Sequence, residues 1–317
     1  MSHRPIQVSI VVPCFNEQEV LPRALGRLHQ VAQQLNLNYE VLLVDDGSTD
    51  ETWSIIDAAS REFPAVVRGF RFARNFGHQA ALTAGLQQAR GEQVFVIDAD
   101  LQDPPELLGA MREKMAEGYD VVYGQRRTRA GETWFKLATA KAFYRIINFL
   151  SEIDIPQDTG DFRLVSRRAT DAFLSLPETN RFIRGMFAWV GFRQIGLLYD
   201  RDARQAGQTK FTLSKMMRFS LDAITSFSIR PLRLAGVFSA LLIASALGLI
   251  VWAFVVRAHG DTVRGWTSLI ITVLFIGGVQ TFILGIIGEY VGRLFLEMKR
   301  RPLYIISTTT DTSSLPR

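Results

Sequence analysis

The sequence predicts an α/β fold: a mostly parallel sheet with helices on both faces, followed by two apolar helices near the C-terminus. Two observations predict the sheet. Short β-rich runs alternate with helical patterns through residues 1–125, and several of these runs are apolar at nearly every position, as in strands buried on both faces. A third observation, two long uncharged segments after residue 230, predicts the apolar helices.

The expected elements alternate along the chain. The strands are VSIVV, YEVLLV, VRGFRF, QVFVI and YDVVYG. Helices are expected over Val20–Leu35, from a capping box at Ser48 and Glu51, over His78–Gly91, and from Pro104 and Pro105 to Gly118. This alternation is typical of a doubly wound sheet.

Two segments, Leu234–Val256 and Gly265–Gly288, carry no charge and are long enough to cross a membrane, which takes about 20 apolar residues. Buried helices of a large core are the alternative. The connector contains Arg257 and Arg264. More basic residues flank the pair on its outer sides: Lys210, Lys215, Arg218, Arg230, Arg233, Arg293, Lys299, Arg300 and Arg301. The positive-inside rule therefore predicts that both long ends are cytosolic, and the N-terminus shows no signal-peptide pattern.

The composition excludes several classes of protein. Cys14 is the single cysteine, which excludes an intrachain disulfide and a multi-cysteine metal site. The net charge is +5, but the basic residues gather beside the apolar segments, which favours anionic lipid over nucleic acid as a partner. Neither a GxGxxG after the first strand nor a P-loop motif occurs, so dinucleotide oxidoreductases and P-loop proteins are not predicted.

Two stretches mix basic, aromatic and apolar residues: TWFKLATAKAFYRIINFL and KFTLSKMMRFSLDAITSFSIRPL. Close to an apolar segment, such amphipathic helices are typical of the membrane interface. Lys136, Lys141 and Arg145 of the first stretch are suited to attract an anionic headgroup. Ordinary helices that face the protein core are the alternative.

Three polar clusters each follow an expected strand: PCFNE, DDGSTDE and DADLQD. Because ligands of open α/β sheets bind outside the carboxyl ends of the strands, we expect the clusters to form one site. Asp98 and Asp100 lie one residue apart and are suited to hold Mg²⁺ or Mn²⁺ together with a diphosphate, although a turn or helix cap is the alternative. Asp45 and Asp46 suit a nucleobase or ribose, or else a helix cap.

Five motifs in order carry a resemblance: SIVVPCFNEQE, VLLVDDGSTDET, VFVIDADLQDPPE, GDFRLVSR and RDARQAGQTKF. Together they resemble the family 2 glycosyltransferases of GT-A fold. More narrowly, the chain is similar to polyprenyl-phosphate glycosyltransferases, which include dolichyl-phosphate mannose synthase and the bactoprenol glucosyltransferases with two C-terminal membrane helices. RNFGHQAALTAGL and GEYVGRLFLEMKRRPLY also resemble the bactoprenol group, so that nearly the whole chain is covered.

The resemblance implies roles for individual residues. The implied donor-binding residues are Pro13, Phe15, Glu17, Val44, Asp46, Asp98, Ala99, Gln102, Arg204 and Lys210, with Asp98 and Asp100 as metal ligands. The implied acceptor-phosphate residues are Arg126, for which Arg127 is the alternative, and Arg163; the implied catalytic residues are Asp161 and Asp100. Many members have tyrosine at the position of Phe15. A phosphate acceptor is largely ionised near neutral pH, so Asp161 is expected to orient a substrate more than to remove a proton. His78 is expected to be structural.

The predicted reaction is inverting transfer of a hexose, with glucose from UDP-glucose as first choice, to undecaprenyl or another polyprenyl phosphate, for modification of cell-envelope glycans. Galactose, N-acetylglucosamine and formylated aminoarabinose are alternative sugars, and a non-catalytic nucleotide-binding membrane scaffold is an alternative class. A processive polysaccharide synthase is disfavoured because no QxxRW motif occurs. The resemblance also implies a homotetramer in the bacterial inner membrane.

The predicted division of the chain has four parts. A cytosolic catalytic domain covers residues 1–210, and a juxtamembrane amphipathic helix covers 211–230. A two-helix transmembrane hairpin covers 231–290, and a cytosolic tail covers 291–317. In this multi-pass arrangement, the catalytic domain and both termini are cytosolic.

Overall fold

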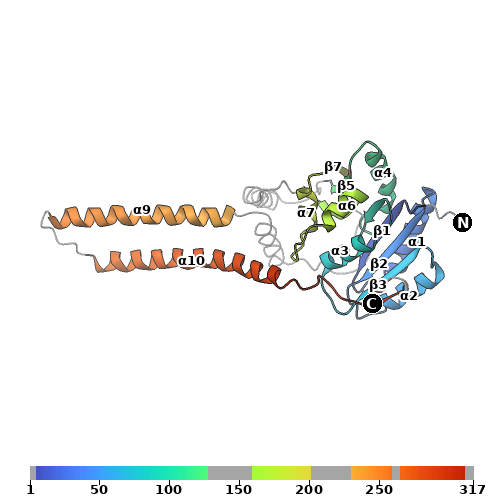
Figure 1. Ribbon diagram of the computed structural model, residues 1–317, viewed down its shortest axis with the longest axis horizontal. Coiled ribbons are helices and arrows are strands. Elements are labelled where there is room, and N and C mark those ends of the chain that lie inside the picture. The colour runs from blue at the N-terminus through green and yellow to red at the C-terminus, as the bar shows by residue number, and fades with distance from the viewer. Residues whose placement is uncertain (1–4, 128–158, 201–229, 259–264, 311–317) are drawn as a thin grey trace.

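The computed structural model describes residues 5–127, 159–200, 230–258 and 265–310 (Figure 1). Its strands are β1 (Val8–Cys14), β2 (Tyr39–Asp45), β3 (Val67–Phe72), β4 (Gln93–Val96), β5 (Val121–Arg126), β6 (Thr159–Ser166), β7 (Gln194–Tyr199) and β8 (Ile306–Thr309). Its helices are α1 (Leu21–Gln34), α2 (Thr52–Glu62), α3 (His78–Gln88), η1 (Pro105–Leu107), α4 (Leu108–Ala116), α6 (Arg167–Leu174), α7 (Ile183–Trp189), α9 (Arg230–Ala258) and α10 (Trp266–Met298). Both predicted interfacial stretches lie wholly or mostly outside the described residues.

The strands form one mixed sheet in the order β7-β5-β6-β4-β1-β2-β3-β8. The centre is parallel, since β1 pairs with β2 and β4, and β2 pairs with β3, all in the same direction. Strand β6 is antiparallel to both β4 and β5, and β8 is antiparallel to β3. The α/β prediction is confirmed, and the sheet is mixed.

Helices cover both faces of the sheet, because each face buries apolar side chains. On one face, α1, α2 and α4 contribute Leu21, Leu25, Ile56 and Met111 to the core. On the other face, α3, α6 and α7 contribute a second set: Ala81, Leu82, Leu86, Ala169, Phe173, Ile183, Met186 and Phe187. All seven residues of β1 are buried, as expected for a central strand between two helical layers.

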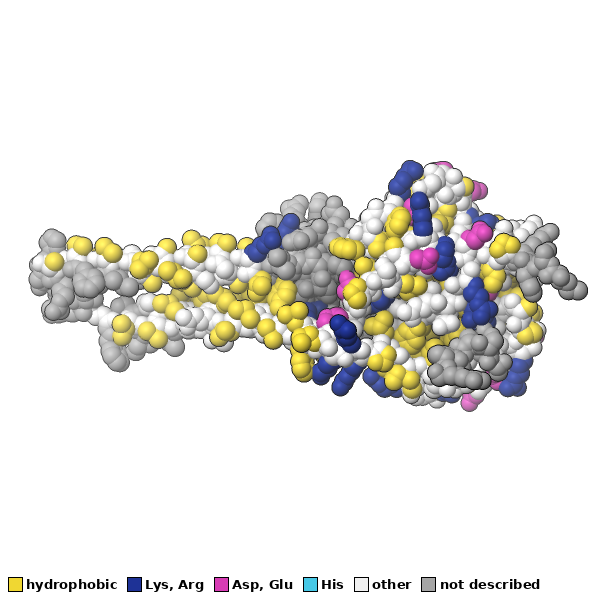
Figure 2. All heavy atoms as spheres, viewed as in Figure 1, with side chains coloured by type: hydrophobic (Ala, Val, Ile, Leu, Met, Phe, Trp, Pro, Cys, Tyr) yellow, Lys and Arg dark blue, Asp and Glu magenta, His cyan; other side chains and the backbone are white. Residues whose placement is uncertain are grey.

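Helices α9 and α10 run side by side away from the α/β domain (Figure 1). Their apolar side chains are largely exposed, as Figure 2 shows along the hairpin; Phe282, for example, is 71% exposed. Among the described residues, one helical segment, Phe275–Met298, is long and apolar enough to cross a membrane, and Leu232–Gly248 of α9 is a shorter apolar stretch. The prediction of two membrane-crossing helices is therefore not confirmed for α9.

The segment after α10 returns to the sheet. The backbone N–H of Ala73 donates to the carbonyl of Ile305, and the ring of Tyr304 stacks on Phe72 at 4.8 Å. Strand β8 then pairs with β3 and closes that edge of the sheet. The part of the chain that the sequence predicted as a cytosolic tail, 291–317, thus contains the end of α10, which continues to Met298, and strand β8.

Candidate active site

The three polar clusters meet at the carboxyl edge of the sheet, as the strand order requires. The backbone N–H of Asn16 donates to Ser48 Oγ at 2.9 Å, and that of Glu17 donates to Thr52 Oγ1 at 2.8 Å, which joins the first two clusters. The backbone N–H of Ile97 donates to the carbonyl of Val11 at 3.1 Å, so the third cluster leaves the sheet beside the first.

A pocket of about 290 Å³ lies between these clusters. Its lining includes seven of the residues singled out from the sequence: Pro13, Phe15, Glu17, Asp46, Asp98, Ala99 and Asp100. It also includes Cys14, Asn75, Gly77, His78 and Ala81. A larger hollow of about 430 Å³ touches Gln93 and Arg112 at the opposite end of the strands, where open α/β sheets do not bind their ligands.

The two aspartates after β2 have different surroundings. Asp45 is fully buried; its Oδ1 accepts from the backbone N–H of Ser48, and its Oδ2 lies 3.2 Å from Arg71 Nε. Asp46 lines the pocket, and its carboxylate accepts from the backbone N–H groups of Phe76 and Gly77. Burial raises the pKa of Asp46, while these two hydrogen bonds oppose the rise. Asp45 therefore holds the turn, and Asp46 lies where a ligand would contact it.

Val44 is a different case among the predicted donor-binding residues. Its side chain is fully buried in the core on the α3 side of the sheet. The side chain is therefore unavailable to a ligand, and any contact with a nucleotide would have to come from its backbone.

The loop after β4 presents buried oxygen atoms that lack a hydrogen-bond donor. Within the described part of the chain, Asp98 Oδ1 and Gln102 Oε1 are buried without a hydrogen bond. Asp100 Oδ1 accepts from the backbone N–H of Gln102 at 3.1 Å, which folds the loop back on itself. Burial raises the pKa of Asp98 to about 6, so the site disfavours its negative charge unless a cation is near.

Arg126 lies beside this loop at the end of β5. Its Nη2 is 4.0 Å from Asp103 Oδ1, and its Nε donates to the hydroxyl of Tyr199 at 3.4 Å. Tyr199 in turn donates to Asp103, and burial with this carboxylate raises the pKa of Tyr199 to about 12. Arg127 instead pairs with Asp200 at 3.3 Å and is 62% exposed, so Arg126 is the arginine that faces the aspartate loop.

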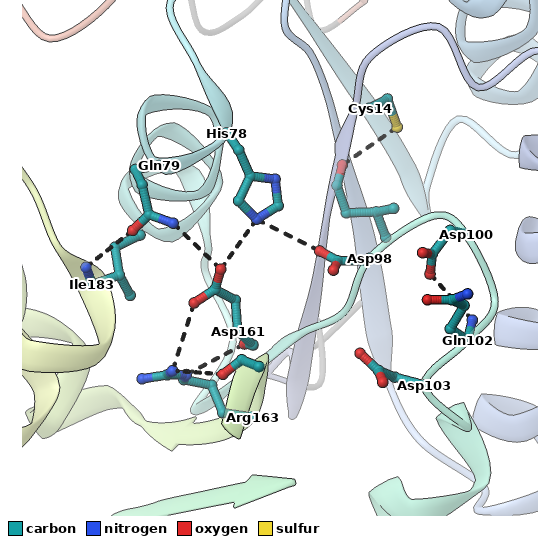
Figure 3. A network of polar contacts seen from close by, with 12 residues as sticks. Cys14, His78, Gln79, Asp98, Asp100, Gln102, Asp103, Asp161, Arg163 and Ile183 are labelled. Carbon is teal, nitrogen blue, oxygen red and sulfur yellow. Dashed lines mark hydrogen bonds and ion pairs between the residues drawn. The ribbon is translucent and has the colours of Figure 1, made fainter. Parts of the chain in front are cut away.

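Asp161, on β6, is surrounded by donors (Figure 3). His78 Nε2 lies 3.2 Å from its Oδ2, and Gln79 Nε2 donates to the same oxygen at 3.3 Å. Arg184 Nε donates to Oδ1 at 3.0 Å. Burial alone would raise the pKa of Asp161, but Arg184, His78 and Arg163 together bring it well below its ordinary value. The carboxylate is therefore ionised and fully engaged with the protein.

His78 connects this carboxylate to the aspartate loop. Its Nε2 is also 3.6 Å from Asp98 Oδ1, so one imidazole bridges Asp98 and Asp161 (Figure 3). Burial alone would lower the pKa of His78, but the hydrogen bond to Asp161 and the charge of Asp98 raise it to about 9. The sequence predicted a structural role for His78 and did not indicate this bridge, because Asp161 lies on β6, far from α3 in the chain.

Arg163 does not line the pocket. Its side chain is 4% exposed, donates to the carbonyls of Gly160 and Asp161, and lies over the ring of Phe187. These contacts leave little of the guanidinium available to bind an acceptor phosphate, which is the role that the resemblance implied for Arg163. Arg204 and Lys210, the predicted basic pair of the donor site, lie outside the described residues.

Comparison with known families decides what kind of site this is. Residues 9–174 match the family described as glycosyl transferase family 2. The chain belongs to this family of glycosyltransferases. Residues 230–294 of this glycosyltransferase, which include α9 and most of α10, match the GtrB C-terminal hairpin.

Three relatives align with nearly the whole glycosyltransferase. "Uncharacterized glycosyltransferase YkcC" of Bacillus subtilis is 48% identical over 96% of this chain and 94% of its own. "Uncharacterized glycosyltransferase sll0501" of Synechocystis is 46% identical over 98% of both chains. "SfII prophage-derived bactoprenol glucosyl transferase" of Shigella flexneri is 40% identical over 95% of this chain and 97% of its own.

Proposed function

We propose that the enzyme transfers a hexose, with glucose from UDP-glucose as first choice, to a polyprenyl phosphate at the membrane surface. The single observation that carries this proposal is the pocket in which Asp98, Asp100 and Asp46 converge, in a chain that also has a long apolar hairpin. A diphosphate and a nucleoside suit the acidic edge of the sheet, and a lipid acceptor suits the hairpin. The name of the Shigella relative, a bactoprenol glucosyl transferase, supports the same reaction.

The residues after β4 fit a divalent cation. The described residues contain no group of three or more His, Cys, Asp or Glu side chains arranged around a metal. Mg²⁺ and Mn²⁺ do not need such a cage, because one or two carboxylates together with substrate phosphates and water complete their coordination. Asp98 Oδ1 and Gln102 Oε1, both buried without a hydrogen bond among the described residues, are suitable oxygen ligands beside Asp100. A cation bound there would neutralise the negative charge of a departing diphosphate.

The remaining donor contacts come from the first two clusters. Phe15 is 36% exposed at the pocket and offers a ring for packing against a base or ribose, although it lacks the hydroxyl that tyrosine would provide. Asp46, whose carboxylate is held by two backbone N–H groups, is suited to accept from a ribose hydroxyl. We assign the basic pair Arg204 and Lys210 to closure over the donor on the basis of the sequence alone.

Asp161 suits an electrostatic role better than that of a general base. A general base must offer a free lone pair to the proton that it removes, whereas both oxygens of Asp161 accept from protein donors. A phosphate acceptor needs little deprotonation near neutral pH. We therefore propose that the ionised acceptor oxygen attacks directly and that the anomeric centre inverts.

The path of the chain supports two membrane crossings. Strands β1–β7 precede α9, and β8 follows α10, yet all eight belong to one sheet. A chain that leaves a domain and returns to it crosses a bilayer an even number of times. At about 1.5 Å per residue, the 29 residues of α9 and the 33 of α10 are each long enough to span the hydrocarbon core. We therefore propose that the α/β domain and the segment after α10 lie on the same side of the membrane, and we assign that side to the cytosol.

The test is transfer of label from a sugar nucleotide to lipid. Purified enzyme would be incubated with undecaprenyl phosphate, Mg²⁺ and separate radiolabelled UDP-glucose, UDP-galactose and UDP-N-acetylglucosamine, and the organic phase would be counted. Label in the lipid phase with one donor far above the others supports the proposal and identifies the sugar. No lipid-linked product with any donor would refute it and favour a non-catalytic membrane scaffold.

A further inference from the structure

We propose that Arg184 is a ligand of the acceptor phosphate and that Asp161 is the buried counter-ion that orients it. This inference rests on the proposed function, because it assigns a substrate to the same site. Arg184 belongs to the stretch RFIRGMFAWVG, for which the sequence indicated no role. It is the second residue of α7, and its guanidinium reaches the carboxylate on β6.

The exposed part of this cluster is positive, and the buried part is negative. The side chains of Asp161 and Arg163 are each 4% exposed, whereas that of Arg184 is 31% exposed. Two guanidinium groups face one carboxylate, so the group of three carries a net positive charge before His78 is considered. An anion that reaches the cluster would meet a guanidinium first.

The position of Arg184 is fixed from two sides. The backbone N–H of Ile183 donates to Gln79 Oε1 at 3.0 Å, which attaches the start of α7 to α3. The Nε and Nη2 atoms of Arg184 both donate to Asp161, at 3.0 and 3.4 Å. A guanidinium held in this way keeps its planar fork in one orientation, which is the geometry that phosphate binding favours.

The location of α7 favours a lipid phosphate over a free one. The segment just before α7 contacts the last turns of α10, where Glu297 accepts from the backbone N–H groups of Thr179 and Asn180. In Figure 1, α7 lies on the side of the domain that faces the hairpin. A polyprenyl phosphate keeps its tail in the bilayer, so its headgroup would approach from this side.

The cluster also lies next to the proposed donor site. His78 joins Asp161 to Asp98, so only one imidazole separates the counter-ion of Arg184 from a proposed cation ligand. A phosphate held by Arg184 would thus lie close to the donor, where an inverting transfer needs it on the face of the anomeric carbon opposite the departing diphosphate. Arg126, which the resemblance implied as an acceptor-phosphate residue, lies beside Asp103 of the aspartate loop, and in this arrangement we assign it to the donor phosphates instead.

The experiment measures binding without sugar transfer. Full-length enzyme in detergent would be titrated calorimetrically with a ten-carbon prenyl phosphate, with inorganic phosphate and with UDP in the presence of Mn²⁺. For Arg184→Gln we expect prenyl phosphate to bind about tenfold more weakly or worse, with UDP binding unchanged. Arg184→Lys, which keeps the charge but not the fork, should bind with intermediate affinity. Unchanged prenyl phosphate binding in Arg184→Gln, or a loss confined to UDP, would overturn the proposal.

Two further variants test whether weaker binding comes from misfolding or from the loss of any arginine. Arg184→Gln removes one of the positive charges that stabilise the buried Asp161 carboxylate. The double variant Arg184→Gln with Asp161→Asn removes the negative charge as well, so it should fold, and it should still bind prenyl phosphate weakly. Arg61→Gln removes an arginine that is 78% exposed on α2, and it should bind all three ligands normally. Normal prenyl phosphate binding by the double variant would contradict the assignment of Arg184.

The titration also distinguishes a lipid phosphate from a free phosphate as the ligand, and it separates failure of this inference from failure of the proposed function. Inorganic phosphate that bound as tightly as prenyl phosphate, with the same dependence on Arg184, would overturn the lipid assignment. Arg184-dependent binding of prenyl phosphate in an enzyme that transfers no sugar would leave this inference standing and refute the proposed reaction. Sugar transfer by an enzyme whose Arg184→Gln variant binds prenyl phosphate normally would support the proposed reaction and overturn this inference.

Discussion

Glu297, near the end of α10, accepts hydrogen bonds from the backbone N–H of Thr179 at 3.0 and 3.1 Å. Through this contact, the hairpin holds the segment that leads into α7. The contact joins α10 to the segment before α7, although the two residues are 118 apart in the chain.

Replacing Glu297 should weaken use of the lipid acceptor without affecting the donor. Glu297→Ala removes the acceptor of two backbone N–H groups, and hydrogen bonds to a charged group contribute about 1.5–3 kcal/mol each. We expect the KM for undecaprenyl phosphate in proteoliposomes to rise about tenfold while the KM for the sugar nucleotide stays constant. Glu289→Ala is the control, because that exposed glutamate pairs only with Arg293 among the contacts described on α10. Equal changes in both KM values would contradict the coupling.

Asp100→Asn should abolish divalent-dependent transfer while leaving membrane insertion intact. The substitution removes the charge of a proposed cation ligand, and loss of one such electrostatic contact costs on the order of 10²-fold in turnover. Turnover and flotation with liposomes would be measured together. Asp57→Asn, on the outer surface of α2, should behave as wild type in both measurements. Near-normal turnover of Asp100→Asn would refute the metal assignment.

Two helical glycines should respond in opposite directions to alanine. A Cβ at Gly85 of α3 would lie 2.2 Å from Val11 Cγ1, in the centre of the core. Gly85→Ala should therefore destabilise the protein by about 1–3 kcal/mol, through overpacking. A Cβ at Gly26 of α1 meets nothing within 4 Å, so Gly26→Ala should stabilise by about 0.4–1 kcal/mol. Thermal unfolding in detergent measures both, and equal shifts would show that the predicted contact with Val11 is wrong.

The stability of the domain should fall as His29 becomes protonated. Burial lowers the pKa of His29 from its ordinary value of 6.5, while the charge of Glu62 opposes the shift. The unfolded chain therefore binds the proton more readily than the folded one, and stability is lost as the pH falls below 6.5. His29→Gln should show a weaker decrease in Tm between pH 7 and pH 5 than wild type. Parallel pH profiles for the two proteins would contradict this sign.

The sequence predicted the parallel half of the sheet and its acidic edge because both signals are local. Buried runs such as those around Val11 and Leu42 identify central strands, and the strand-end rule then brings Asp46 and Asp98 together. Strand β8 was not predicted because it has only four residues and its partner β3 lies more than 230 residues earlier in the chain. No spacing within the tail indicates such a pairing.

The network around Asp161 could not be predicted for a related reason. His78, Asp161 and Arg184 come from α3, β6 and α7, and no motif links their positions in the sequence. The burial of Arg163 could not be predicted either, since a basic residue two positions after an aspartate in GDFRL suggests a ligand as readily as a core contact. Only the antiparallel insertion of β6 beside β4 brings these side chains together.

One measurement tests the account most directly: transfer of radiolabelled hexose from its UDP donor to undecaprenyl phosphate by the purified enzyme, before and after exhaustive chelation. We predict that chelation abolishes labelled lipid, that Mn²⁺ or Mg²⁺ restores it, and that neither ion restores it in Asp100→Asn. Undiminished labelling in the presence of chelator, with wild type and Asp100→Asn equally active, would contradict a cation held at the carboxyl edge of the sheet.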